Sequence, residues 1–352
     1  MVVGGDEGRT AWLNWCQQRP STDGPLDGGS ARLLPLLYAP LLRDDKDLPF
    51  RDLVVNRYRK SLLAHQMTLH RALPALRLLQ AAGYDPMVTK GVSLAVRFYD
   101  DLGARMISDV DVVIRDDVAG ALELLECNGW SGADATIPAA QVLTRSHAVN
   151  LVDGRGGSLD VHSRMMALSR PGLDGPVFDR AVPTRLGDMT VLMPCAADEL
   201  LLAVVHGWAW SKESSIRWIP DVAAIEPSMG PDDWQLLIAE AHHRQVSFRA
   251  WSALSAAHSF GVAVPDWVLD DLANGPFERF EQAEQRWHTT PHNHVPPGVF
   301  AYFEYVRRSG PPAGVSWWRG FAEYYMSLIA MPAGGNPVKW LILKGKRRAE
   351  RS

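Results

Sequence analysis

The chain has 352 residues and a formal net charge of -4, with 47% hydrophobic and 22% charged residues. This length suffices for two domains that share a core, and the composition is ordinary for a globular protein. The charge excludes a global basic field, so nucleic acid would have to bind through a local patch. A long polynucleotide is therefore not the expected partner.

The cysteines and the N-terminus bear on the cellular compartment. Cys16, Cys127 and Cys195 are widely separated and form no C-x-x-C motif, which argues against a disulfide framework and against a zinc knuckle. The N-terminus lacks the basic segment followed by an apolar core that a signal peptide needs, and no apolar run approaches the roughly 18 residues of a membrane span. We therefore expect a cytoplasmic protein.

The residue pattern changes twice in the first half of the chain. Residues 1–50 form an N-terminal arm that is partly irregular, with a short helix near 11–17. Residues 51–84 have apolar side chains at helical spacing and end at Gly83, which predicts a long helix or a helix pair. Residues 85–194 then alternate between strand and helix patterns. The predicted strands are 85–90, 108–114, 148–152, 158–162 and 189–192, and the predicted helices begin at Gly91 and at Asp116 or Asp117.

The second half is mostly helical. Residues 195–335 form a predicted helical domain, and residues 336–352 form a basic tail, for which a solvated terminus is favoured over contact with a membrane or with RNA. The predicted helices of this half are 196–210, 216–225, 232–243 and 247–260. The fold class is therefore α+β, a small mixed β-sheet with helices on one side, flanked by N-terminal helices and a helical C-terminal domain.

Acidic and aliphatic residues alternate from Ser108 to Ile114. Side chains two apart in a strand point to one face, so Asp109 and Asp111 are expected to project together, roughly 6.6 Å apart. Such carboxylates repel each other unless a cation lies between them, and Mg²⁺ is commonly held by one or two carboxylates plus substrate phosphates. Asp160, on the second strand of the predicted hairpin, is placed to supply a third carboxylate to a two-metal site.

The residues after the first predicted strand suit phosphate binding. Gly91 permits a close approach of the backbone, and the N–H groups that start the next helix, with the Ser93 hydroxyl, offer donors to phosphates. Lys90 and Arg105 could add positive charge there. Together with the acidic strand, this turn predicts phosphoryl chemistry on a nucleotide.

The order of these motifs resembles the nucleotidyltransferase superfamily that includes DNA polymerase beta and aminoglycoside nucleotidyltransferases. It is closer to the bacterial "uncharacterised nucleotidyltransferase" family, whose pattern is Lys-Gly, a Tyr, Arg-x-x-x-Asp-x-Asp, a helix ending in Gly-aromatic, and an Asp-x-His strand. The resemblance covers most of residues 50–230, and the Lys-Gly motif departs from the more usual Gly-Ser of the superfamily. The matching positions are Lys90-Gly91, Tyr99, Arg105 to Asp111, Gly129-Trp130, Asp160-Val161-His162, His206-Gly207-Trp208 and Arg217 to Asp221.

This resemblance implies transfer of a nucleoside monophosphate from an NTP to an acceptor hydroxyl or phosphate, with release of pyrophosphate. Asp109 and Asp111 would ligate two Mg²⁺ or Mn²⁺ ions, and Asp160 would ligate one of them and help to deprotonate the acceptor. A small molecule or a peptide of a bacterial biosynthetic pathway is the favoured acceptor, and RNA is the alternative. The rival functions are a toxin-like tRNA nucleotidyltransferase and a catalytically silent binding or antitoxin-like module. The sequence leaves the oligomeric state open.

Two histidines have both a functional and a structural interpretation. His162 faces the same side of its strand as Asp160, so it either supports that carboxylate or packs in the core. His206 lies on an apolar helix, where it either packs or contacts the nucleotide.

Three further patterns are interpreted structurally. Arg217 and Asp221 are spaced for a local ion pair on a helix. An aromatic stripe near the C-terminus predicts packing between the domains, and a histidine-containing stretch predicts a solvated loop and not a metal site. The stripe comprises Trp317, Trp318, Phe321, Tyr324, Tyr325 and Met326, and the stretch contains His288, His292 and His294.

Overall fold

The structure is a computed structural model of the chain. It describes residues 5–18, 26–42, 45, 47–132, 138–143, 146–167, 169–170, 172–208, 216–275, 281–283, 302–303, 305–306 and 316–328. The predictions for the histidine-containing stretch and for the basic tail lie outside these residues. Among the described helices, none combines the length and the apolar character that crossing a membrane requires.

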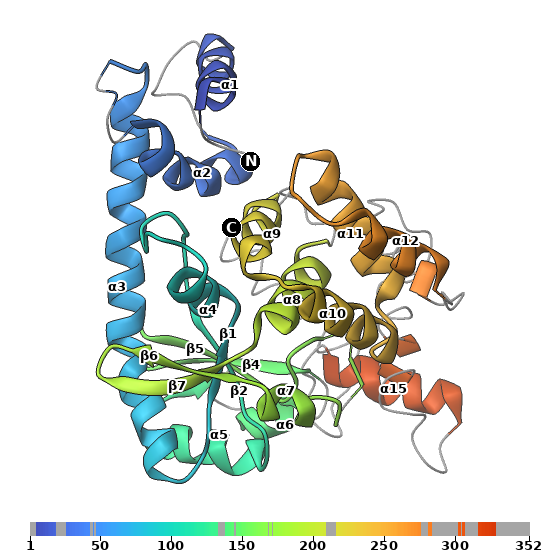
Figure 1. The fold of residues 1–352 in the computed structure, drawn as a ribbon. Helices are drawn as coiled ribbons and strands as arrows, with labels where there is room; N and C mark the ends of the chain where they lie inside the picture. Colours follow the sequence, from blue (N-terminus) through green and yellow to red (C-terminus); the bar gives the residue numbers. More distant parts are fainter. Residues whose placement is uncertain are drawn as a thin grey trace.

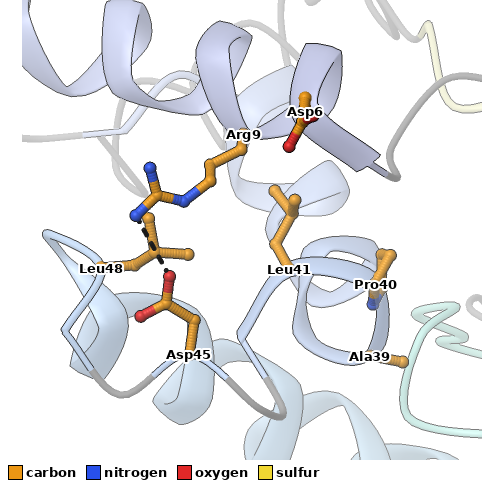
Figure 2. A pocket seen from close by; sticks show the side chains of 7 residues that line it. All are labelled: Asp6, Arg9, Ala39, Pro40, Leu41, Asp45 and Leu48. Atoms are coloured by element: carbon orange, nitrogen blue, oxygen red, sulfur yellow. Dashed lines mark hydrogen bonds and ion pairs between the residues drawn. The ribbon is translucent and has the colours of Figure 1, made fainter.

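The N-terminal arm has a small core of its own. It comprises α1 (Gly5–Gln17), α2 (Gly28–Leu33) and the short turns η1 (Leu34–Leu37) and η2 (Tyr38–Leu42). Its buried side chains are Trp12, Cys16, Leu34, Leu41, Leu48 and Val54. A hollow of about 310 Å³ lies beside α1, lined by Asp6, Arg9, Ala39, Pro40, Leu41, Asp45 and Leu48. Arg9 and Asp45 form an ion pair at 3.3 Å there (Figure 2).

The segment predicted as a helix or a helix pair is one helix, α3 (Arg51–Ala81), which continues through Pro74. It stands along one side of the sheet (Figure 1). The helix ends where Gly83 adopts a φ of 89°, a left-handed conformation that glycine takes at no steric cost. The buried face of its second half is made by Ala72, Ala75, Leu76 and Leu79.

The sheet is mixed, as predicted, and has seven strands in the order β3-β4-β5-β2-β1-β7-β6. β2 pairs in parallel with β5, and β1 with β7, whereas the other pairs are antiparallel. The hairpin of β4 and β5 has the predicted bounds. The strands are β1 (Met87–Thr89), β2 (Val110–Val113), β3 (Ser131–Gly132), β4 (Ala148–Val152), β5 (Ser158–His162), β6 (Val182–Leu186) and β7 (Met189–Met193).

Two strands were not predicted, and both lie at the sheet edges. β3 has only two residues, too few for a periodic pattern. β6 contains Pro183 and is largely exposed, which is compatible with an edge strand because no neighbour needs the missing N–H. Because most side chains of β6 are exposed, its sequence lacks the alternation of apolar and polar residues by which a strand is recognised.

Four helices belong to the sheet region: α4 (Lys90–Arg97), α5 (Val118–Cys127), α6 (Ala139–Leu143) and α7 (Gly175–Asp179). Asp117 caps α5 as predicted, because its side chain accepts a hydrogen bond from the Gly120 N–H.

The helical half follows the predicted pattern closely and adds α12. It comprises α8 (Ala196–Gly207), α9 (Trp218–Ile225), the short turn η3 (Glu226–Ser228), α10 (Pro231–His243), α11 (Ser247–Ser259), α12 (Asp266–Asn274) and α15 (Trp317–Leu328). The aromatic stripe on α15 is only partly core, since Phe321 and Tyr324 contact the buried Tyr302 whereas Trp318 is 73% exposed.

The sheet separates two apolar cores. One face packs on α3 and α5 through side chains such as Val110, Val112 and Val161. The other face meets the helical half through Met87 and Val113. The prediction of helices on one side was therefore incomplete, since the helical half covers part of the second face. By strand alternation, Asp111, Asp160 and His162 share this second face.

Candidate active site

Parallel pairing of β2 with β5 brings two acidic residues together. Asp111 is the register partner of Asp160, and Val113 is the partner of His162. The His162 ring reaches both acids, with Nε2 3.0 Å from Asp111 Oδ1 and 3.1 Å from Asp160 Oδ2. A buried imidazole thus joins the two carboxylates.

Lys90 adds a cation to this cluster. Its Nζ lies 2.7 Å from Asp111 Oδ1 and 3.3 Å from His162 Nε2. The residue is the first of α4 and has a φ of 52°, which is uncommon for a side chain with a Cβ. We call Asp111, Asp160, His162 and Lys90 the acid cluster, although it contains two basic groups.

The surroundings keep both carboxylates of the acid cluster ionised. Burial alone would raise the pKa of Asp111, but the hydrogen bond from His162 and the charge of Lys90 outweigh it and hold that pKa well below its usual range. The pKa of Asp160 is lowered against its burial by His162. The pKa of His162 is raised, since its bonds to both acids outweigh the effect of burial.

Asp109 lies beside the acid cluster and does not join it. Asp109 directly precedes β2, which begins at Val110, and its carboxylate is not part of the group of close ligand atoms formed by Asp111, Asp160 and His162. Its carboxylate accepts a hydrogen bond from the Ser108 hydroxyl at 3.1 Å. Burial, together with the charge of Asp111, raises the pKa of Asp109. Asp109 is therefore close enough to interact electrostatically with the acid cluster.

The donor set fits a divalent cation. Ligand atoms of Asp111, Asp160 and His162 lie within 4.8 Å of one another. Carboxylate oxygens suit Mg²⁺ and Mn²⁺. The His162 Nε2 carries the proton that bonds to both carboxylates, so in this arrangement it orients the acidic ligands and does not itself coordinate the ion. The predicted set was Asp109, Asp111 and Asp160, and the group of close ligand atoms contains Asp111 and Asp160.

The guanidinium of Arg105 is occupied by a partner in the helical half. Arg105 is 5% exposed and makes two hydrogen bonds to Asp221 of α9, at 2.7 and 2.9 Å. Its Nη1 also donates to the Gly91 carbonyl at 3.1 Å, and Tyr99 donates to Asp221 at 2.7 Å. The structure therefore places Arg105 between the Gly91 turn and α9.

The predicted ion pair between Arg217 and Asp221 was wrong. Asp221 is taken by Arg105, because a bidentate guanidinium satisfies both carboxylate oxygens at once. Arg217 instead donates to the Met106 carbonyl at 3.3 Å.

The start of α4 faces a buried carboxylate. The Lys90 N–H donates to Glu199 Oε1 of α8 at 2.9 Å, and the Ser93 side chain is fully buried next to the same carboxylate. Ser93 lies close enough to lower the pKa of Glu199, although no well-aligned hydrogen bond joins the two side chains. Burial is the larger effect and raises the pKa of Glu199 to about 7.

His206 lies in the last turn of α8, near enough to Lys90, Asp111 and His162 to interact with their charges. Its surface is exposed, yet the surrounding protein and the charge of Lys90 lower its pKa to about 4, so the ring is neutral at physiological pH. A neutral exposed imidazole at this place can donate or accept a hydrogen bond.

Comparison with protein families identifies the chain. The profile of a family described as "Uncharacterised nucleotidyltransferase" matches residues 30–261. The chain belongs to this family. It is a nucleotidyltransferase, and the matched region contains the acid cluster, Arg105 and Asp221.

A comparison with curated proteins found no match. Solved structures that resemble this nucleotidyltransferase do so remotely. The antibiotic-resistance factor ANT(2'')-Ia is 12% identical with a TM-score of 0.34, covering 55% of this chain and 98% of that one. An antigenic nucleotidyltransferase-like protein from Paracoccidioides brasiliensis is 14% identical with a TM-score of 0.39, covering 61% and 93%. A tRNA-processing enzyme is 13% identical with a TM-score of 0.22, covering 73% and 77%.

Sequence reasoning missed Glu199 and the true partner of Asp221. One signal was available for Glu199, because Asp198 and Glu199 interrupt a continuous apolar helical run from Ala196 to Val205. Acidic side chains are almost never fully buried unless they are paired. Asp198 and Glu199, inside this apolar run of the nucleotidyltransferase, therefore indicated polar partners from elsewhere in the chain.

Proposed function

We propose that this nucleotidyltransferase moves a nucleoside monophosphate from an NTP to an acceptor hydroxyl or phosphate, with release of pyrophosphate and in dependence on Mg²⁺ or Mn²⁺. The observation that carries the proposal is the parallel register that sets Asp111 beside Asp160, with His162 and Lys90 in contact with Asp111. A cluster of ionised carboxylates next to a lysine is complementary to a metal-bound triphosphate.

Asp111 and Asp160 would hold the divalent ions, with Asp109 as the adjacent ligand that the family pattern implies. When bound, these ions neutralise the charge of the triphosphate and stabilise the attacking and leaving oxygens. His162 holds both carboxylates in place through its Nε2. The proposal of two ions rests on the family pattern, since the geometry brings together ligand atoms of Asp111, Asp160 and His162.

Asp160 would accept the proton of an acceptor hydroxyl. Its side chain is 24% exposed, compared with 10% for Asp111, so an incoming acceptor can reach it more readily. Its lowered pKa keeps it ionised at neutral pH. Lys90, the only lysine or arginine that ion-pairs within the acid cluster among the described residues, would bind the phosphates of the NTP.

The charge of the chain favours a small acceptor, which is either a small molecule or a peptide. The net charge of -4 provides no general attraction for RNA. RNA therefore ranks second, and a catalytically silent module of the same fold ranks third.

Transfer can be tested without knowledge of the acceptor. Purified protein is incubated with each radiolabelled NTP, Mg²⁺ or Mn²⁺, and fractionated cell extract, and label is followed into small-molecule, peptide and RNA fractions. We expect label in a small-molecule or peptide fraction and loss of that label in Asp160→Asn. Asp188→Asn is the matched control, because Asp188 pairs with Arg77 on the surface with 70% of its side chain exposed. Label in no fraction would favour the silent module.

A further inference from the structure

The backbone conformation of Lys90 is unusual and is not fixed by its own helix. Lys90 has a φ of 52°, in the left-handed region that side chains with a Cβ rarely adopt. The preceding residue, Thr89, makes no side-chain hydrogen bond that would cap α4. Another group must therefore stabilise the Lys90 backbone.

That group is Glu199. Its carboxylate is fully buried, and Oε1 accepts the Lys90 N–H at 2.9 Å across 109 residues of sequence. Figure 1 shows α4 and α8 next to each other, and the two helices are in contact. A buried backbone N–H without a partner is costly, so this hydrogen bond stabilises the backbone conformation in which it is formed.

The ammonium end of Lys90 contacts Asp111 in the acid cluster. Nζ lies 2.7 Å from Asp111 Oδ1, and 15% of the side chain is exposed. Because the hydrogen bond to Glu199 holds the Lys90 backbone, the ammonium group can point in fewer directions. A left-handed φ at Lys90 turns the side chain away from the course that an ordinary first helical residue would take.

We propose that Glu199 is the positioning residue for Lys90: by accepting the Lys90 N–H it holds the left-handed backbone that delivers the lysine ammonium to Asp111. The proposal deepens the proposed function and rests on it in one respect, that Lys90 binds the triphosphate of the NTP. It also assigns a role in the active site to a residue of the helical half.

The competing explanation is that Glu199 merely balances charge. Arg97 and Arg105 lie near its carboxylate and favour its ionised form. The two explanations differ in what a neutral acceptor would do. Glu199→Gln keeps an oxygen for the Lys90 N–H and removes the charge, whereas Glu199→Leu removes both.

The first measurement follows Lys90 directly and needs no substrate. Protein labelled with ¹³C and ¹⁵N at lysine gives ammonium signals in NMR spectra, and the Lys90 signal is identified by its loss in Lys90→Met. We expect the wild type and Glu199→Gln to share the signal of an ion-paired ammonium, and Glu199→Leu to show Lys90 at the position of exposed lysines. Asp198→Asn is the control, because Asp198 is a buried acid on the same helix that pairs with Arg180 at 2.7 Å.

The second measurement is the affinity for Mg²⁺-ATP by calorimetry. Glu199→Leu and Lys90→Met should each weaken binding by about tenfold, and the double variant should be no more than about twofold weaker than either, because coupled residues are non-additive. Glu199→Gln should bind within about threefold of the wild type. Additive losses would assign Glu199 a role independent of Lys90 and would overturn the proposal.

Failure of the proposed function is distinguishable from failure of this inference. If the wild type binds no Mg²⁺-ATP, the nucleotide role of Lys90 is lost while the NMR comparison still decides the positioning role. An unchanged Lys90 signal in Glu199→Leu would refute the positioning role. Glu199→Met, which keeps the length of the side chain without a strong acceptor, is the second variant if Glu199→Leu does not fold. If neither folds, Glu199 serves the whole fold and the proposal is wrong.

Discussion

Arg105 of the sheet region and Asp221 of α9 form a buried bidentate ion pair, with hydrogen bonds of 2.7 and 2.9 Å between residues 116 positions apart. Both side chains are 6% exposed. Tyr99 donates to the same carboxylate, so both oxygens of Asp221 accept at least one hydrogen bond. This contact joins the turn at Gly91, the residue after Lys90, to the helical half.

Removal of one partner of this pair should destabilise the fold. Asp221→Asn leaves the Arg105 charge buried without a counter-charge, which typically costs about 3–5 kcal/mol. Arg105→Lys should also be less stable than the wild type, because an ammonium group cannot reproduce the two parallel hydrogen bonds of a guanidinium. The free energy of unfolding in urea measures both changes. A loss below about 1 kcal/mol for Asp221→Asn would contradict the buried-pair description.

Glu199 should make stability depend on pH between about 4.5 and 7. Its pKa in the folded protein is raised to about 7 from an ordinary value of 4.5, so the folded state binds the proton more tightly than the unfolded state does. This contribution is complete below the ordinary pKa and is lost as pH rises through about 7. Glu199→Gln should therefore gain stability relative to the wild type between pH 5 and pH 8, by at most about 3 kcal/mol.

Glu240 offers a matched control for this pH dependence. Its carboxylate pairs with Arg244 at 2.9 Å and with Arg180 at 3.0 Å, and its pKa is lowered against its burial by these partners. That contribution is present above the ordinary pKa and is lost only at more acidic pH. The stability difference between the wild type and Glu240→Gln should stay constant between pH 5 and pH 8, as measured by urea unfolding at each pH. If the stability difference from the wild type changed equally with pH for Glu199→Gln and Glu240→Gln, the pH dependence could not be assigned to Glu199.

Metal affinity should depend on the acid cluster even without a nucleotide. Asp111→Asn removes a carboxylate from the ligand set and should weaken Mn²⁺ binding, measured by electron paramagnetic resonance, by at least about tenfold. Asp109→Asn should have a smaller effect on the metal alone, because Asp109 lies beside the cluster and bonds to Ser108. Equal Mn²⁺ affinity in the wild type and Asp111→Asn would place the metal elsewhere.

Asp160 should matter more for turnover than for nucleotide binding. Asp160→Asn keeps the volume of the side chain and removes its charge, so Mg²⁺-ATP should still bind through Asp111 and Lys90. Transfer to the true acceptor should fall by at least about a hundredfold, the lower range for loss of a general base. Pyrophosphate release with that acceptor measures the change, and unchanged release would refute the role of Asp160.

Local patterns in the sequence predicted much of the sheet region. The hairpin of β4 and β5 and the cap at Asp117 follow from turn and capping chemistry within a few residues. The acidic residues Asp111 and Asp160 follow from period-two alternation combined with the family pattern. These features depend on short segments of chain, and short segments are what a single sequence reports well.

Contacts over long separations could not be predicted. Arg105 matched a motif near the phosphate turn, yet its charge is satisfied by a residue of α9 that no local rule connects to it. The Ser93 hydroxyl looked available for phosphate, and the packing of α8 buries it against Glu199. Which polar groups remain accessible is decided by how distant elements pack, and one sequence does not report that packing.

The long separations in this site also set an order of events during synthesis. β2 and β5 can pair once His162 has left the ribosome, but Asp221 follows only after a further stretch of chain, roughly 3 to 12 s later at about 5–20 residues per second. Glu199 is made before Asp221, so the acceptor of the Lys90 N–H becomes available first, and Arg105 lacks its counter-charge until the interval ends. A fragment that ends before α8 contains all seven strands of the sheet but lacks Glu199 and Asp221. It should therefore recover the native arrangement of Lys90 and Arg105 only when the remainder of the chain is supplied.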